Sequence, residues 1–159
     1  MKVIPIPANE DNYQYLIIDS ATNQSAIVDP VHLSSIHSTV KESGSQLVSA
    51  LVTHHHWDHA GGTGQLAKEV PGVRIYGGDA NRIDSITDTL TKQGEKFRLG
   101  ELDVTPLLTP CHTSTHVCYY LEDGGTGERA VFTGDTLFIA GCGRFFEGGF
   151  WENEWRSAC

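Results

Sequence analysis

The sequence lacks the features that mark secreted or membrane-spanning proteins. Its four cysteines, Cys111, Cys118, Cys142 and Cys159, include no CxxC pair, so we expect reduced thiols rather than a disulfide framework. The N-terminus shows no apolar segment of the signal-peptide kind. No apolar run is long enough to cross a bilayer. We therefore expect a cytoplasmic protein that makes no use of a membrane.

Clusters of lysine and arginine are also missing. The 11 basic residues are outnumbered by 20 acidic residues, which gives a formal net charge of −9 with histidine counted as neutral. An acidic chain without a basic patch is a poor candidate for binding nucleic acid or an anionic membrane surface. Two bound divalent cations would cancel about four of these negative charges, by simple addition of ion charges. We expect no nucleic-acid partner.

The length and the pattern of elements indicate one domain. A chain of 159 residues normally forms a single core, and no repeat, low-complexity tract or linker interrupts this one. Strand-like segments alternate with turns and helices, which predicts an α/β fold with packed sheets and outer helices. Leu47–Val52 is nearly all apolar and is predicted to be a strand buried on both faces. The other expected strands are Lys2–Pro7, Tyr13–Ile18, Ser25–Val28, Val73–Tyr76, Lys96–Leu99, Leu102–Leu108, His116–Leu121 and Ala130–Thr133, and the expected helices are Val31–Ser43, Gln65–Val70 and a polar stretch around Ala80–Thr91.

The loop after Leu47–Val52 carries four strong metal-binding side chains: His54, His56, Asp58 and His59. In an extended backbone alternate side chains point the same way, so His54 and His56 can reach one ion. Asp58 and His59 follow a bend and can reach a neighbouring ion. Imidazole and carboxylate groups suit zinc and similar divalent ions, and two such ions can generate hydroxide at neutral pH. The loop therefore predicts a metal-assisted hydrolase rather than a solvated histidine-rich turn, with His55 left over.

Two later strand ends are expected to complete this site. His112 follows an apolar strand and a proline that fixes the backbone before it, and it is the natural third ligand for the first ion. Asp135 follows another strand, in a Gly-Asp-Thr turn, where its two oxygens can bridge two ions. His116 is interpreted as an outer partner of the ligands or as a structural residue.

Three segments of the chain closely resemble the hydroxyacylglutathione hydrolase family, also called glyoxalase II, of the metallo-β-lactamase superfamily. They are Thr53–Gly62, Thr109–Tyr120 and Val131–Gly148, and the likeness runs from about residue 1 to about residue 148. The first motif is shared by the whole superfamily, whereas the other two are more specific. The resemblance implies an α/β fold of the αββα sandwich type, with metals at one edge of the sheets.

The resemblance also implies a ligand set for two divalent ions. Zinc is the expected metal, although iron and manganese suit the same donors. His54, His56 and His112 would hold the first ion, Asp58 and His59 the second, and Asp135 would bridge them.

A reaction follows from the same resemblance. S-D-lactoylglutathione, a glutathione thioester, would be hydrolysed to D-lactate and glutathione by a metal-bound hydroxide that Asp58 helps to orient. Arg144 matches a basic position near the glutathione moiety, where it would meet a substrate carboxylate. Phe146 stands where some members of the family have tyrosine, so a hydroxyl contact to substrate is expected to be missing.

The end of the chain departs from the family pattern. We expect residues 1–148 to form a partial metallo-β-lactamase-like domain and residues 149–159 a divergent, mobile tail. Family members continue with a further histidine for the second ion and a helical C-terminal domain, but no histidine follows His116 here. We therefore expect the second ion to bind more weakly than the first. We also expect an uncovered apolar strand at Val131–Thr133 to favour self-association.

Two alternatives to an active thioester hydrolase follow from these departures. One is a truncated, non-catalytic isoform that binds metal without turnover. The other is an oxidoreductase like the persulfide dioxygenases, which share the fold and the first motif but use one iron ion. The Thr109–Tyr120 and Gly134–Gly148 motifs favour the hydrolase.

Overall fold

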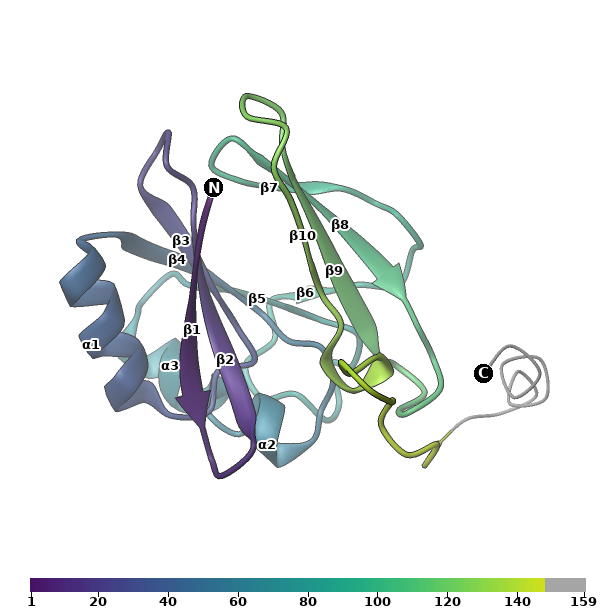
Figure 1. Ribbon diagram of the computed structural model, residues 1–159. Helices are drawn as coiled ribbons and strands as arrows, with labels where there is room; N and C mark the ends of the chain where they lie inside the picture. The colour runs from purple at the N-terminus through teal and green to yellow at the C-terminus, as the bar shows by residue number, and fades with distance from the viewer. Residues whose placement is uncertain (148–159) are drawn as a thin grey trace.

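Two β-sheets pack face to face in the computed structural model, which describes residues 1–147 (Figure 1). The first sheet has the strand order β1-β2-β3-β4-β5-β6, and the second has the order β10-β9-β8-β7. Strands β3 to β6 run parallel, whereas β1, β2 and the whole second sheet are antiparallel. The strands are β1 (Lys2–Ala8), β2 (Asn12–Ile18), β3 (Gln24–Val28), β4 (Gln46–Leu51), β5 (Arg74–Gly77), β6 (Asp88–Thr89), β7 (Phe97–Leu99), β8 (Leu102–Leu108), β9 (Val117–Asp123) and β10 (Arg129–Phe132).

Strand alternation divides the core into two layers. Successive side chains of a strand point to opposite faces, so Leu51 packs between the two sheets while Ala50 and Val52 pack toward the helices. In β2, Ile17 faces the second sheet, and the residues on either side of it face the helices. The prediction that the Leu47–Val52 segment is buried on both faces is confirmed.

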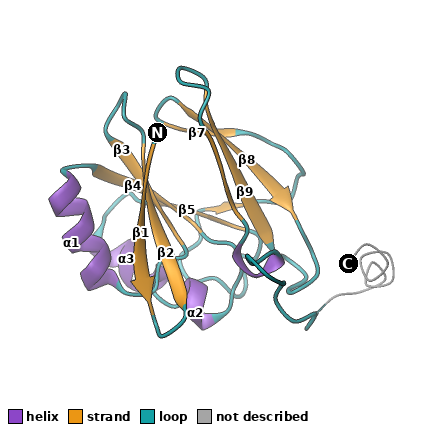
Figure 2. Ribbon diagram, viewed as in Figure 1, coloured by secondary structure: helices purple, strands orange, loops and turns teal. Residues whose placement is uncertain are grey.

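Two of the helices cover the outer face of the first sheet (Figure 2). Helix α1 (Leu33–Ser43) buries Leu33 and Ile36 and ends at Gly44, whose φ of 67° suits a glycine. Helix α3 (Thr63–Glu69) buries Leu66 against the same layer. Within residues 1–147 no helix covers the outer face of the second sheet. For these residues the predicted α/β sandwich of two packed sheets with outer helices is confirmed.

One predicted helix is wrong. The stretch around Ala80–Thr91 forms turns and the short strand β6. The Asp79 carboxylate accepts hydrogen bonds from the backbone N–H groups of Asn81 and Arg82, which favours a turn over a helix. Ser85 then has a φ of 60°, which a right-handed helix does not allow.

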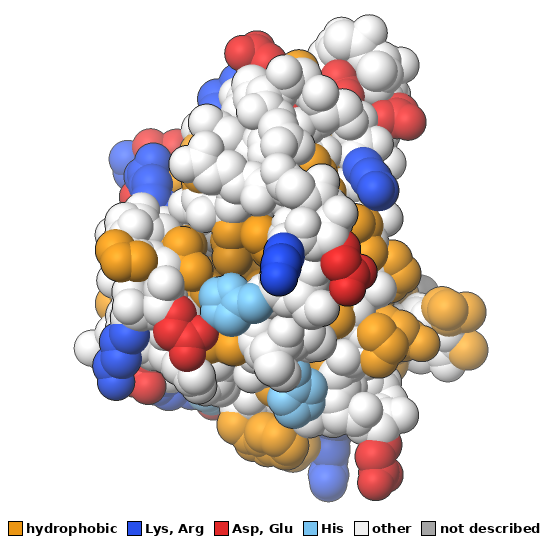
Figure 3. All heavy atoms as spheres, turned by 90° about the vertical axis from the view of Figure 1, so that its left-hand side faces the viewer, with side chains coloured by type: hydrophobic (Ala, Val, Ile, Leu, Met, Phe, Trp, Pro, Cys, Tyr) orange, Lys and Arg blue, Asp and Glu red, His pale blue; other side chains and the backbone are white. Residues whose placement is uncertain are grey.

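The surface shows no gathering of basic side chains on the face drawn in Figure 3, where Lys and Arg lie interspersed with Asp and Glu. Among the described residues no helix is both long and apolar enough to span a membrane. The predicted tail at residues 149–159 lies outside the described residues.

Candidate metal centre

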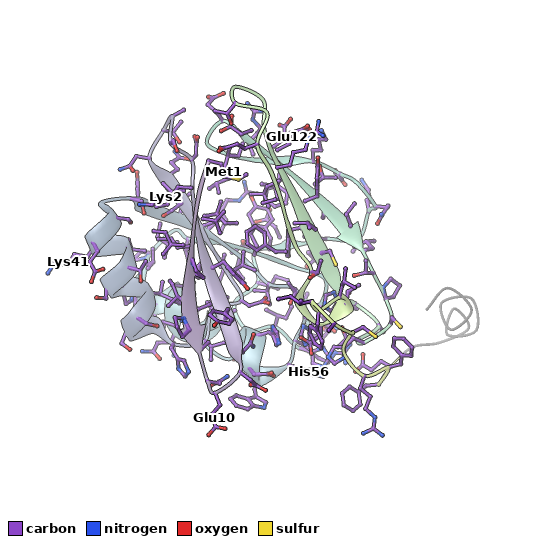
Figure 4. The ribbon with its side chains drawn as sticks, viewed as in Figure 1. Met1, Lys2, Glu10, Lys41, His56 and Glu122 are labelled. Atoms are coloured by element: carbon purple, nitrogen blue, oxygen red, sulfur yellow. The ribbon has the colours of Figure 1, made fainter. Side chains whose placement is uncertain are left out.

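The predicted ligands lie at the end of the sandwich where several strands finish. Strand β4 leads into the histidine loop that contains His56, β8 leads toward His112, and β10 leads toward Asp135. The short helix α2 (Trp57–Ala60) carries Asp58 and His59. Figure 4 shows His56 next to α2, at the same end of the molecule as the β1–β2 turn. Neighbouring strand ends therefore bring together side chains that are far apart in the sequence.

Three histidines form the first donor cluster. The Nδ1 atom of His56 lies 3.1 Å from His54 Nε2 and 3.1 Å from His112 Nε2. Nitrogen ligands at the usual zinc distance of about 2.0 Å lie about 3.3 Å apart in a tetrahedral site, so one ion fits among these three atoms. Burial lowers the pKa values of His54 and His56. Both imidazoles are thereby kept neutral, as metal ligation requires.

His54, His59 and Asp135 form a second donor cluster. Asp135 Oδ1 lies 3.2 Å from His59 Nε2, and Asp135 Oδ2 lies 3.3 Å from His112 Nε2. One carboxylate thus faces both clusters with different oxygens. Asp58 is in neither cluster, although its Oδ2 lies 3.6 Å from His59 Nε2.

Asp29 is an important residue of this site that the sequence interpretation missed. Its Oδ2 lies 2.8 Å from His59 Nδ1, and its carboxylate accepts hydrogen bonds from the Thr53 N–H and hydroxyl. Burial disfavours the imidazolium form of His59 and so lowers its pKa. The attraction of the Asp29 and Asp135 carboxylates is stronger than this effect of burial, and the pKa of His59 is raised to about 10. The two carboxylates thus favour a positive charge here, which a proton or a metal ion can supply. Its position in the sequence could have indicated this role. Asp29 directly follows β3, which pairs with β4, the strand that leads into the histidine loop.

His116 is buried behind the donor clusters and belongs to neither of them. Its Nδ1 lies 3.1 Å from the hydroxyls of Thr109 and Thr136, and its ring stacks on His54 at a centroid distance of 5.0 Å. Burial lowers the pKa of His116 to about 3. Gly134 makes room for this packing, because an added Cβ would lie 2.9 Å from His116 Nε2.

His55, the histidine expected to be left over, is in neither cluster. Its Nε2 lies 3.2 Å from Arg82 Nη1 instead.

The two predicted substrate-binding residues lie beside the first donor cluster. The Phe146 ring packs edge-on against the rings of His56 and His112, at centroid distances of 5.9 and 5.4 Å. The Arg144 guanidinium lies 5.5 Å from the centre of the Phe146 ring. The backbone carbonyl of Arg144 accepts a hydrogen bond of 2.7 Å from His112 Nδ1, which leaves His112 Nε2 free to face the cluster.

Two hollows open next to the donors. The larger, ≈ 900 Å³, runs between β1 and β10, and His59 and Asp135 are the members of the donor clusters that line it. The smaller, ≈ 540 Å³, is lined by His56, His112 and Asp135 together with Asp58 and Phe146. Because the smaller hollow touches residues of both clusters, it is the better candidate for substrate.

Comparison with known sequences supports a metal site. Residues 10–158 match the metallo-beta-lactamase superfamily. The chain is 44% identical to the cytoplasmic hydroxyacylglutathione hydrolase of Arabidopsis thaliana over 161 residues, covering 100% of this chain and 61% of that protein. It is 43% identical to a hydroxyacylglutathione hydrolase-like protein of Gallus gallus, covering 93% of this chain and 52% of that protein. The chain thus spans little more than half the length of these relatives.

Solved structures share the fold. A metallo-beta-lactamase from Staphylococcus aureus superposes with a TM-score of 0.80 at 26% identity, over 92% of this chain and 46% of that one. ETHE1 from Myxococcus xanthus superposes with a TM-score of 0.76 at 30% identity, over 94% of this chain and 64% of that one. Sequence match, fold and converging histidines agree: the chain belongs to the metallo-beta-lactamase superfamily, whose members bind divalent metal ions.

Proposed function

We propose that this chain carries the metal centre of a thioester hydrolase of the hydroxyacylglutathione hydrolase type. The substrate would be S-D-lactoylglutathione and the products D-lactate and glutathione. The observation that supports this most is the Asp135 carboxylate, whose two oxygens face two histidine clusters. The 43–44% identity to the Arabidopsis and Gallus relatives favours this hydrolase type over other members of the superfamily.

Two divalent ions, zinc by preference, are proposed for the two clusters. His54, His56 and His112 would hold the first ion. His59 and Asp58 would hold the second, with Asp135 shared. When bound, such ions polarise a carbonyl oxygen and lower the pKa of water.

The other residues would position the reactants. Asp58 lines the smaller hollow, where its carboxylate can orient the attacking water and accept a proton from it. The oxygen of that water adds to the thioester carbonyl, the C–S bond breaks, and the departing sulfur takes a proton to become the thiol of glutathione. Arg144 would meet a carboxylate of the glutathione moiety. Phe146 would form an apolar wall beside the acyl group.

The second ion is proposed to be the weaker one. The first cluster supplies three imidazoles, whereas the second shares His54 with the first and adds only His59 and Asp135. Dialysed protein should therefore retain closer to one ion than two. Two equally tight ions would contradict this assignment.

One experiment tests the proposed function. Metal content and glutathione release from S-D-lactoylglutathione are measured on the same zinc-loaded sample. His54→Ala should lose the tightly held ion and all activity, because His54 lies in both clusters. His37→Ala is the matched control, since His37 lies on α1 and pairs with Glu69. Retained metal without release would favour the non-catalytic alternative. A single bound iron with sulfur oxidation would favour the dioxygenase-like alternative.

A cytoplasmic location is part of the proposal, in line with the name of the Arabidopsis relative. Fractionation of cells that express the tagged chain would test it.

A further inference from the structure

A network of charged side chains lies beside the first donor cluster but outside it. Arg82, in the turn region between β5 and β6, is at its centre. The Arg82 guanidinium donates to Asp79 Oδ2, to Glu147 Oε1 at 2.6 Å and to Ser114 Oγ at 3.1 Å. Glu147 Oε2 in turn accepts from the Ser114 N–H at 2.9 Å and from its hydroxyl at 3.0 Å. Each side chain thus has several partners from separate parts of the chain.

Glu147 is attached to the segment that forms one wall of the candidate site. Residues 143–147 contain no helix or strand, so no backbone ladder holds them in place. At one end of the segment the Gly143 N–H donates to the Asp135 carbonyl at 2.7 Å. At the other end the bonds of Glu147 to Arg82 and Ser114 tie it to the body of the molecule. These bonds lower the pKa of Glu147 to about 2.

Residues 143–147 contact two of the proposed metal ligands. The Arg144 carbonyl accepts from His112 Nδ1, and the Phe146 ring packs against His56 and His112. A histidine that donates from Nδ1 presents the lone pair of Nε2, so the carbonyl selects the tautomer that can bind metal. If residues 143–147 moved away, His112 would lose this selection.

The approach is close at Gly143. An added Cβ there would lie 2.8 Å from His112 Nδ1 and 2.5 Å from the Asp135 carbonyl oxygen. A small displacement of residues 143–147 would therefore change their contacts with two proposed ligands, His112 and Asp135.

We propose that Arg82 and Glu147 are positioning residues of the metal centre: their ion pair holds residues 143–147 so that the Arg144 carbonyl keeps His112 in its metal-binding tautomer. This inference rests on the proposed function, which makes His112 a ligand of the first ion. Neither Arg82 nor Glu147 is a ligand itself.

Zinc affinity, measured by competition with a chromophoric chelator, is the first test. Arg82→Met should weaken tight zinc binding by about tenfold, the lower end of the range for outer partners of metal ligands. Glu147→Gln should weaken it less, because the amide keeps one acceptor. Arg82→Lys should recover part of the affinity, since it restores the charge but not the forked contacts. Arg74→Met is the matched control: it breaks the Arg74–Asp88 pair at the start of β5 and should leave zinc affinity unchanged.

The second test needs no metal. Long-range ¹H–¹⁵N NMR on the chelator-treated protein reports which nitrogen of His112 carries the proton. The parent and Arg74→Met should show protonated Nδ1, whereas Arg82→Met and Glu147→Gln should show a mixture of tautomers. Unchanged tautomers together with zinc affinities within about twofold of the parent would overturn the proposal. If Arg82→Met does not fold, Glu147→Gln decides alone. If the parent binds no zinc, the proposed function fails, while the tautomer measurement still tests the role of the pair.

Discussion

At the residue scale, Asp29 links the histidine loop to the second donor cluster through its contacts with Thr53 and His59. It is 4% exposed and is held by hydrogen bonds from Thr53 on one side and His59 on the other. Its φ of 51° is left-handed, a conformation that Asp and Asn tolerate better than most residues. Replacement by asparagine therefore changes charge and hydrogen bonding without adding backbone strain.

Asp29→Asn should lower the free energy of unfolding by about 2 kcal/mol, because it weakens charged hydrogen bonds at a buried position. It should also reduce metal retention, since His59 loses the partner that orients its ring. Urea unfolding and metal analysis after dialysis measure the two effects. Asp103→Asn, at an exposed ion pair with Arg98, is the control and should change stability by less than about 0.5 kcal/mol. Equal effects of the two variants would contradict this role of Asp29.

At the scale of elements, the two sheets are joined by Asp19 at the end opposite the site. The buried Asp19 carboxylate accepts hydrogen bonds from the Ala21 and Thr22 backbone in the β2–β3 turn and from the Glu101 N–H in the β7–β8 turn. An added Cβ at Gly100, where φ is 56°, would lie 2.2 Å from Asp19 Oδ2. The turn between β7 and β8 therefore requires glycine at this point.

The pKa of Asp19 gives a prediction about pH. Burial alone would raise it, but hydrogen bonds from Thr22, Glu101 and Ala21 outweigh burial and lower it. The stabilisation is therefore present above the unfolded pKa of about 3.9 and is lost as the pH falls through the lower folded pKa. Asp19→Asn should cost about 1–3 kcal/mol near neutral pH and less near pH 3. Denaturant unfolding across this range measures both. A cost that does not change with pH would show that the carboxylate charge is unimportant here.

At the scale of the whole molecule, the two sheets leave an apolar hollow between their edge strands. Strands β1 and β10 are the outer strands of their sheets, and the ≈ 900 Å³ hollow between them is lined by Val3, Val131 and Leu137. Val131 is 54% exposed and Ile139 fully exposed. Exposed apolar side chains beside an unpaired strand edge favour association with another chain.

We therefore predict concentration-dependent self-association of the isolated chain. Val131→Lys should shift sedimentation velocity profiles toward monomer, because the charge would have to be buried at the β10 edge. Ser38→Lys adds the same charge on α1, away from this hollow, and should leave the distribution unchanged. A parent chain that is monomeric at all concentrations would contradict the prediction.

The sequence by itself determined the features that neighbouring residues control. A nearly continuous apolar run was enough to predict Leu47–Val52 as a strand buried on both faces, and the spacing of His54, His56 and His59 indicated metal donors within one loop. The helix prediction for Ala80–Thr91 was wrong because the Asp79 side chain accepts hydrogen bonds from the local backbone, which compete with helix formation.

Only the tertiary structure decided which distant residues meet. The partnership of Asp29 with His59, 30 residues apart, follows from the parallel pairing of β3 with β4. The ion pair of Arg82 with Glu147, 65 residues apart, holds residues 143–147 against the turn after β5. Such contacts depend on strand order and on how the sheets pack, and no periodicity along the chain encodes either. The convergence of the histidines with Asp135 could therefore be predicted, whereas the side chains that hydrogen-bond to them could not.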